Sequence, residues 1–354
     1  MVRSLSPSSR DGSMASDPPY GSANGLPVYK GRAITDNSQM NALTDNGARV
    51  ELACGDIDAA LHYFTDEAGF HIKSIYPADA PRVVELSGPG LRLRLTGGAP
   101  VETTDPELTV TRLTDEGFGT GRAGMEYRDL IPGRFGGQFV ASHIRIPKGG
   151  PVPDYVHHHD IAFQMVFCVN GWVKVVYEDQ GAPMLMKTGD CFLQPPHIRH
   201  RVLECSDEME VIEIACPAEH ETIVDHEMNL PTGRELPERE FGEQKFVFHQ
   251  ADKAAWLLSD VPGIRYRNTG IASATGGVAS AVVVRADGRC GDIPLRHSAE
   301  FRFCYFLEGS ATLVNGESIS VSRGDAIAVP PNVDCRLEQL SEGAELLEVF
   351  VPRN

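Results

Sequence analysis

The order of apolar and polar residues predicts a small mixed α/β unit where the regular part of the chain begins. The stretch ARVELAC, from Ala48, alternates as a strand does. In DIDAALHYFTDEAGF, four apolar residues share one helical face: Ile57, Ala60, Leu61 and Phe64. Asp56 suits the helix N-cap and Gly69 its end. Three alternating runs follow, HIKSIY, RVVELSG and LRLRLTG. The pattern therefore predicts a βαβββ module over residues 47–100.

The longer C-terminal part consists of short alternating runs separated by turns, which is typical of β-sandwiches and barrels. It also contains an internal repeat. VAS at Val140 recurs at Val278, and GDCFLQPPHIRH at Gly189 recurs as GDAIAVPPNVDC at Gly324. The offset shortens by three residues within one hairpin, where EDQGAPML becomes VNGESI. Duplicated β domains differ in this way, so the sequence predicts a mainly β fold with two homologous barrels.

The repeat sets the expected domain boundaries. The two barrels would occupy residues 127–235 and 236–354, after a polar linker over residues 101–126. Residues 1–46 are rich in Ser, Pro and Gly at their start and lack the apolar segment of a secretory signal. We expect them to form a disordered tail and linker.

Composition and charge narrow the class of partner. The 354 residues include 49 acidic and 32 basic ones, for a net charge of −17, which disfavours nucleic acid and anionic membrane surfaces. The sequence has no apolar run long enough for a transmembrane helix. Its eight cysteines include no CxxC pair, which favours reduced thiols and a cytoplasmic location. A small-molecule ligand is the expected partner.

The stretch DYVHHHDIAFQ carries the strongest chemical signal. Residues i and i+2 of a strand point to one face, so His157 and His159 can both enter a barrel while His158 points outward. Gln164 and His200 can approach from neighbouring strands. Three imidazoles and an amide oxygen suit one divalent transition metal, with Fe(II) favoured and Mn, Ni, Zn or Cu possible. No residue stands out as the general acid or base.

This spacing resembles the two signature motifs of the cupin superfamily, in which the first supplies two His and usually a Glu, and the second a His. The resemblance implies double-stranded β-helix barrels and four metal ligands, His157, His159, Gln164 and His200. The chain departs from the common pattern at Gln164, where Glu is usual, and at His197, where Gly is common. The two copies together resemble a bicupin, a protein with two cupin barrels in one chain.

The second copy has lost most of these ligand types. Its equivalent positions hold Leu295, His297, Arg302 and Cys335. A guanidinium beside a cation is unfavourable, so we expect this degenerate cupin to be free of metal and structural. An alternative is that Arg302 holds an anion in a second pocket.

The βαβββ module resembles one half of the paired unit of the vicinal-oxygen-chelate (glyoxalase-like) superfamily. The place where that family often carries a metal ligand holds Arg49, which cannot ligate a metal. The interpretation is therefore a structural or dimer-forming role, with a second active site as the alternative. Exposed strand edges favour a homodimer.

Three classes of function remain open. The first is a metal-dependent dioxygenase acting on a small chelating oxygen-containing substrate, as in bicupin dioxygenases. The second is a non-redox isomerase, lyase or hydrolase of a carbonyl or sugar-acid substrate, favoured because the neutral Gln164 leaves the metal its full double positive charge. The third is a ligand-binding or sensor protein without turnover.

Overall fold

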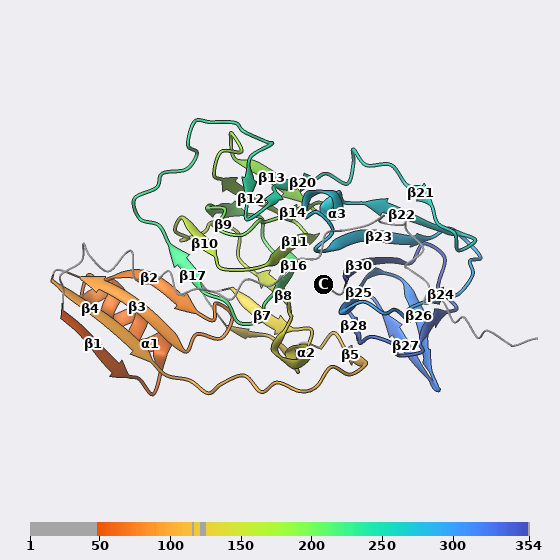
Figure 1. The fold of residues 1–354 in the computed structure, drawn as a ribbon, viewed down its shortest axis with the longest axis horizontal. Helices are drawn as coiled ribbons and strands as arrows, with labels where there is room; N and C mark the ends of the chain where they lie inside the picture. Colours follow the sequence, from red (N-terminus) through yellow and green to blue (C-terminus); the bar gives the residue numbers. More distant parts are fainter. Residues whose placement is uncertain (1–47, 89, 115–116, 121–124, 353–354) are drawn as a thin grey trace, which may run out of the picture.

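The computed structural model describes residues 48–88, 90–114, 117–120 and 125–352, and the tail predicted over residues 1–46 lies outside them. The described residues are mainly in β-strands with a few short helices, as predicted (Figure 1). None of the helices in this part of the chain is long and apolar enough to cross a membrane.

The N-terminal unit has the predicted βαβββ order. Its elements are β1 (Ala48–Ala53), α1 (Ile57–His62) with the π-helical turn η2 (Tyr63–Glu67), β2 (His71–Tyr76), β3 (Val83–Gly88) and β4 (Leu91–Thr96). Asp56 caps α1 by accepting a hydrogen bond from the backbone N–H of Ala59, 2.9 Å away. The apolar helical face packs on alternate residues of β3 and β4, including the fully buried Val84 and Leu95.

The first barrel region is built from two sheets. Its strands are β6 (Gly119–Thr120), β7 (Glu126–Asp129), β8 (Val140–Ile146), β9 (Gly150–Pro151), β10 (His157–His159), β11 (Phe163–Asn170), β12 (Trp172–Tyr177), β13 (Met184–Lys187), β14 (Cys191–Leu193), β15 (His200–Cys205), β16 (Met209–Cys216), β17 (Thr222–Val224) and β20 (Val247–His249). One sheet has the order β20-β14-β11-β16-β8-β7-β6. The other has the order β17-β10-β15-β12-β13, with β9 beside β15. Inward side chains from both sheets form one apolar cluster.

The second barrel region repeats this arrangement. Its strands are β5 (Thr109–Thr111), β21 (Leu257–Leu258), β22 (Ile264–Asn268), β23 (Ser280–Ala286), β24 (Ile293–Pro294), β25 (Phe301–Glu308), β26 (Ser310–Asn315), β27 (Glu317–Ser322), β28 (Ala326–Val329), β29 (Arg336–Glu338) and β30 (Glu345–Val351). They form the sheets β21-β22-β23-β30-β25-β28-β5 and β24-β29-β26-β27. The three-residue shortening falls between β26 and β27, where the chain reverses at Gly316. Short connecting elements complete the two regions: α2 (Arg134–Gly137), the hairpin β18 (Glu240–Phe241) and β19 (Gln244–Lys245), and α3 (Ile271–Ala274).

The two barrel regions pack through the outer faces of their seven-stranded sheets. A single cluster of buried residues draws side chains from β8, β11, β14 and β16 on one side and β23, β25, β28 and β30 on the other. The rings of Phe139 and Phe301 stack across it with centroids 4.1 Å apart. The two barrel regions therefore share one buried apolar interface.

The segment predicted as a linker contributes a strand to the far barrel. β5 pairs with β28 of the second region, and β20 pairs with β14 of the first region in the equivalent way. Each exchanged strand is anchored by the aspartate of a GD turn. Asp325 accepts from the backbone N–H of Leu113 at 3.0 Å, and Asp190 accepts from that of Ala251 at 2.7 Å.

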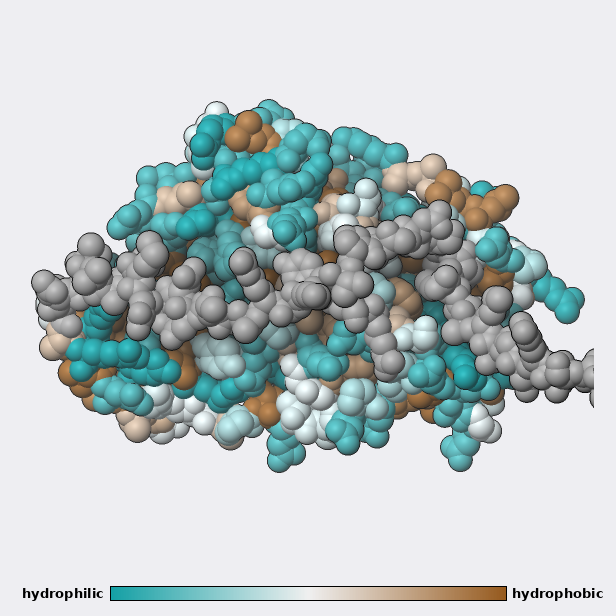
Figure 2. All heavy atoms as spheres, viewed as in Figure 1, coloured by the Kyte–Doolittle hydropathy of each residue, from teal (hydrophilic) through white to brown (hydrophobic). Residues whose placement is uncertain are grey.

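The N-terminal unit is joined to the first barrel region by a continuous sheet. β2 pairs with β17, so the order β1-β4-β3-β2 runs on into β17-β10-β15 (Figure 1). The β2–β3 loop is thereby held beside the barrel. The face seen in Figure 2 is mostly hydrophilic, with an apolar patch at β21, where Leu257 and Leu258 are exposed.

Candidate metal centre

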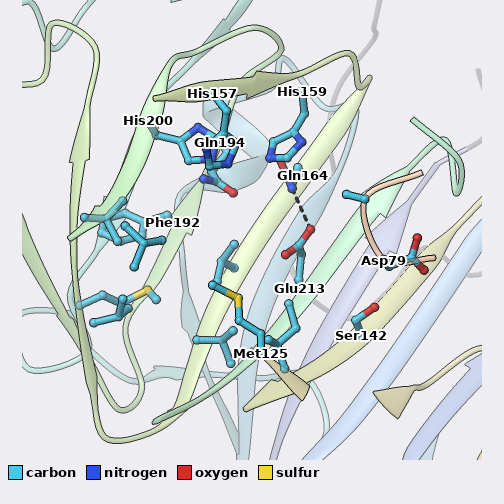
Figure 3. Close-up of a pocket in the computed structure, with 18 of the residues that line it drawn as sticks. Asp79, Met125, Ser142, His157, His159, Gln164, Phe192, Gln194, His200 and Glu213 are labelled. Atoms are coloured by element: carbon cyan, nitrogen blue, oxygen red, sulfur yellow. Dashed lines mark hydrogen bonds between the residues drawn. The ribbon is translucent and has the colours of Figure 1, made fainter. Parts of the chain in front are cut away.

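Three histidines meet at one end of the first barrel's interior. His157 and His159 lie on β10, and His157 is the register partner of His200 on β15. One ring nitrogen from each histidine lies within 4.8 Å of the other two, and all three residues are buried. Figure 3 shows the rings side by side with Gln164 and Gln194. The group could hold a metal ion, because three converging imidazoles suit a divalent transition metal.

Each imidazole is oriented by a contact at Nδ1. The partners are the carbonyl of Tyr155 for His157 at 2.8 Å, the hydroxyl of Thr222 for His159 at 2.9 Å, and the carbonyl of Ile198 for His200 at 3.0 Å. A carbonyl only accepts, so two of these contacts require the proton on Nδ1. Such outer contacts fix the tautomer and present Nε2 as the ligand atom.

Gln164 enters the same site from β11. Its amide Nε2 donates a 2.8 Å hydrogen bond to Oε1 of Glu213 on β16 (Figure 3). Its Oε1 is buried and has no hydrogen-bond partner within the described chain. A carboxylate cannot donate to an amide oxygen, so Glu213 fixes which end of the amide it faces. A buried unpaired oxygen is costly, and a cation beside the histidines would satisfy it.

Apolar side chains form most of the pocket wall around these polar groups. Val175, Phe192 and Met209 are among them. Tyr177 and Gln194 add a polar pair, in which Nε2 of Gln194 donates to the tyrosine hydroxyl at 3.1 Å. Burial raises the pKa of Tyr177 well above its ordinary value, so the ring keeps its proton.

The other polar residues of the motif face away from the pocket. His158 is buried behind β10 with its ring 5.5 Å from that of His197. Burial, with the positive charge of Arg199 nearby, lowers the pKa of His158 to about 4. Arg199 pairs with Asp225 at 2.8 Å, and Arg201 is exposed. The position of His158 on the face of β10 opposite the pocket follows the strand alternation expected from the sequence.

Two lining features have no signal in the sequence pattern. His220 lines the pocket from the turn between β16 and β17, where strand alternation does not apply. Ala78 and Asp79 line it from the β2–β3 loop of the N-terminal unit (Figure 3). This contact between the N-terminal unit and the barrel joins residues far apart in the sequence, and the pairing of β2 with β17 creates it.

The second barrel region has an ion pair at the place that corresponds to the Gln164 amide in the first region. Arg302 on β25 takes the position that Gln164 has on β11. Its Nη2 lies 3.0 Å from Oε2 of Glu348, the counterpart of Glu213. Both side chains are buried. His297 contacts the carbonyl of Val329 through Nε2 at 2.9 Å, and burial lowers its pKa. The guanidinium therefore brings a fixed positive charge to this position.

The sequence matches no family model and no curated protein, but solved structures share its fold. A protein from Pseudomonas aeruginosa named as glyoxylate-induced is 16% identical, covers 73% of this chain and 95% of its own, and has a TM-score of 0.53. Salicylate 1,2-dioxygenase of Pseudoaminobacter salicylatoxidans with gentisate is 17% identical, covers 71% and 83% respectively, and has a TM-score of 0.52. The described chain therefore has a mainly β, cupin-type fold, as predicted.

Proposed function

We propose that the chain is a metal-dependent cupin dioxygenase with one active barrel. Its ligands are His157, His159, Gln164 and His200, and Fe(II) is the favoured metal. The single observation behind this proposal is the meeting of three oriented, buried imidazoles with an unpartnered buried amide oxygen. Metal ligands in proteins have this combination of burial and outer-sphere support.

The proposed reaction cleaves a C–C bond of a chelating, oxygen-containing substrate. O₂ is the four-electron oxidant, and each of the two carbons of the broken bond gains one of its oxygen atoms. A bound divalent iron would supply Lewis acidity and one-electron chemistry toward O₂. The neutral Gln164 leaves more positive charge on such a centre than a glutamate would.

The protein's own residues prepare this chemistry. The Nδ1 contacts hold the three rings in place, and Glu213 turns the oxygen of Gln164 toward them. The valine, methionine and phenylalanine walls exclude water and strengthen electrostatic interactions inside the pocket. Tyr177 remains protonated and can donate a hydrogen bond to a substrate oxygen.

A non-redox isomerase or lyase is the second candidate. The observation that favours it is the neutral amide of Gln164. A more electropositive metal centre polarises a carbonyl strongly but gives electrons to O₂ less readily. The same four residues would serve, and no O₂ would be consumed.

Metal content and O₂ uptake test both candidates. We expect about one iron per chain by mass spectrometry in the wild type, little in His200→Ala, and an unchanged amount in His197→Ala. His197 is a matched control, because it lies three residues away with an exposed side chain outside the pocket. O₂ uptake with β-diketones or catechols supports the dioxygenase. Zinc, nickel or manganese without O₂ uptake favours the second candidate, and no metal after reconstitution refutes both.

Assembly and location remain part of the proposal. β1 ends the sheet that spans the N-terminal unit and the first barrel, and its residues are mostly exposed. An unpaired edge strand can pair with a second copy, so we propose a cytoplasmic homodimer with a glyoxalase-like N-terminal module. A monomer mass by light scattering would contradict the dimer.

A further inference from the structure

A short turn connects the metal centre to the N-terminal unit. It comprises residues 217–221 between β16 and β17, and two consecutive side chains within it contact different parts of the molecule. Glu219 contacts the N-terminal unit, whereas His220 lines the pocket beside His159. Consecutive residues thus link the two parts of the molecule.

His220 lines the pocket and has a buried ring nitrogen without a hydrogen-bond partner among the described residues. The residue is 7% exposed, and its ring lies edge-on to that of His159 with centroids 5.4 Å apart. Its Nδ1 contacts the carbonyl of Pro217 at 3.1 Å. That oxygen can only accept, so Nδ1 carries a proton, and in the tautomer that this contact selects Nε2 is the acceptor nitrogen. Nε2 is buried and has no hydrogen-bond partner among the described residues.

The N-terminal unit holds this turn in place through Glu219. The hydroxyl of Tyr76 donates to its Oε2 at 2.9 Å, and Nη2 of Arg82 donates at 2.7 Å. The hydrogen bond from Arg82 keeps the pKa of Glu219 below its ordinary value, which preserves the charged contact. Both donors flank the β2–β3 loop that brings Ala78 and Asp79 to the pocket.

We propose that His220 is a substrate-binding residue whose Nε2 accepts a hydrogen bond from a hydroxyl group of the substrate, and that the N-terminal unit positions it. The inference rests on the proposed metal site, to which the substrate's chelating oxygens would bind. A donor is required because Nε2 is an acceptor, and an uncharged donor suits a pocket that is largely apolar. An anionic group would meet the carboxylate of Glu213.

Hydroxamates provide a test that does not depend on turnover. Benzohydroxamic acid chelates the metal, and its ortho-, meta- and para-hydroxy derivatives keep the chelating group while moving one hydroxyl around the ring. We would measure their Kd values by calorimetry on the metal-loaded protein. We expect one isomer to bind about three- to tenfold more tightly than the parent, the gain of one buried hydrogen bond.

The variants assign that preference to His220. His220→Phe keeps a ring but removes the acceptor, so the preference should vanish while metal content and the affinity of the parent hydroxamate change little. His220→Gln restores an acceptor oxygen and should recover part of it. Glu219→Gln should weaken it with metal content unchanged, and His197→Ala should keep it.

The outcomes separate this inference from the function it rests on. Equal binding of all isomers by the wild type, or an undiminished preference in His220→Phe, would overturn the role of His220. A wild type that takes up no metal would instead refute the metal site. If His220→Phe fails to fold, the comparison of His220→Gln and Glu219→Gln with the wild type decides the question.

Discussion

Gln164 and Arg302 occupy equivalent places in the two barrel regions, and each contacts a glutamate from the neighbouring strand. The glutamate is common to both copies, as Glu213 and Glu348. In the first copy the partner is a neutral amide whose oxygen remains available, and in the second it is a cation. One side chain therefore decides whether the position can face a metal ion or already carries the positive charge.

Replacing Glu213 should weaken metal binding without removing a ligand. In Glu213→Gln the amide of Gln164 loses its charged acceptor and can rotate, so the metal Kd should rise about tenfold or more. Competition with a chelating dye measures this. Glu227→Gln is the control, because that side chain is exposed. An unchanged Kd in Glu213→Gln would contradict the orienting role.

Breaking the Arg302–Glu348 pair should lower the free energy of unfolding strongly, whereas replacing both residues by apolar ones should lower it little. Arg302→Met alone leaves a buried carboxylate, so the free energy of unfolding should fall by about 3–5 kcal/mol. The double variant Arg302→Met, Glu348→Leu removes both charges and should recover most of that loss. Urea denaturation of the single and double variants checks this, and equal losses in both would argue against it.

At the scale of elements, two strands cross between barrels and each is anchored by one aspartate. Asp325 also contacts Nη1 of Arg112 and the backbone N–H of Ser322, and Asp190 contacts that of Lys187. The GD turn thus holds its own hairpin and the incoming strand together. The contacts of Asp325 thereby hold the segment predicted as a linker against the second barrel region.

Removing either aspartate should release one strand only. In Asp325→Ala the amides of residues 109–113 should lose protection from hydrogen exchange, because their anchor and one buried acceptor are gone. In Asp190→Ala the loss should fall on residues 247–251 instead. Mass spectrometry of exchanged peptides reads both regions in each variant, so each serves as the other's control. Loss of protection throughout the chain would contradict local anchoring.

At the scale of the whole molecule, buried thiols link stability to pH. All eight cysteines are free, and burial raises the pKa of both Cys168 and Cys216 to about 12. The unfolded chain has thiols of ordinary pKa and releases their protons first. Stability is therefore intact below about pH 9 and falls as pH rises from 9 towards 12.

We expect each of these two thiols to cost about 1 kcal/mol of unfolding free energy by about pH 10. Urea denaturation between pH 8 and about 10 measures the slope. The double variant Cys168→Ala, Cys216→Ala should have a lower stability at pH 8 but a shallower decline. A slope equal to that of the wild type would show that other groups control the alkaline loss.

The sequence predicted well whatever depends on local periodicity or on the repeat. Alternation placed His157 and His159 on one face of β10, and the repeat aligned Gly189 with Gly324, whose φ angles of 89° and 86° agree. It did not predict the contact of β5 with β28 or the approach of Asp79 to the pocket, because neither leaves a periodic pattern.

The sequence by itself determined the order of the elements, the repeated sequence pattern and the residue types of the candidate metal centre, since these follow from side-chain periodicity and ligand chemistry. Only the tertiary structure decided which groups face one another. The orientation of Gln164 by Glu213, the placement of His220 beside His159 at the pocket, and the exchange of β5 and β20 all join residues distant in the chain. Long-range packing fixes such contacts, and local sequence preference carries no record of them.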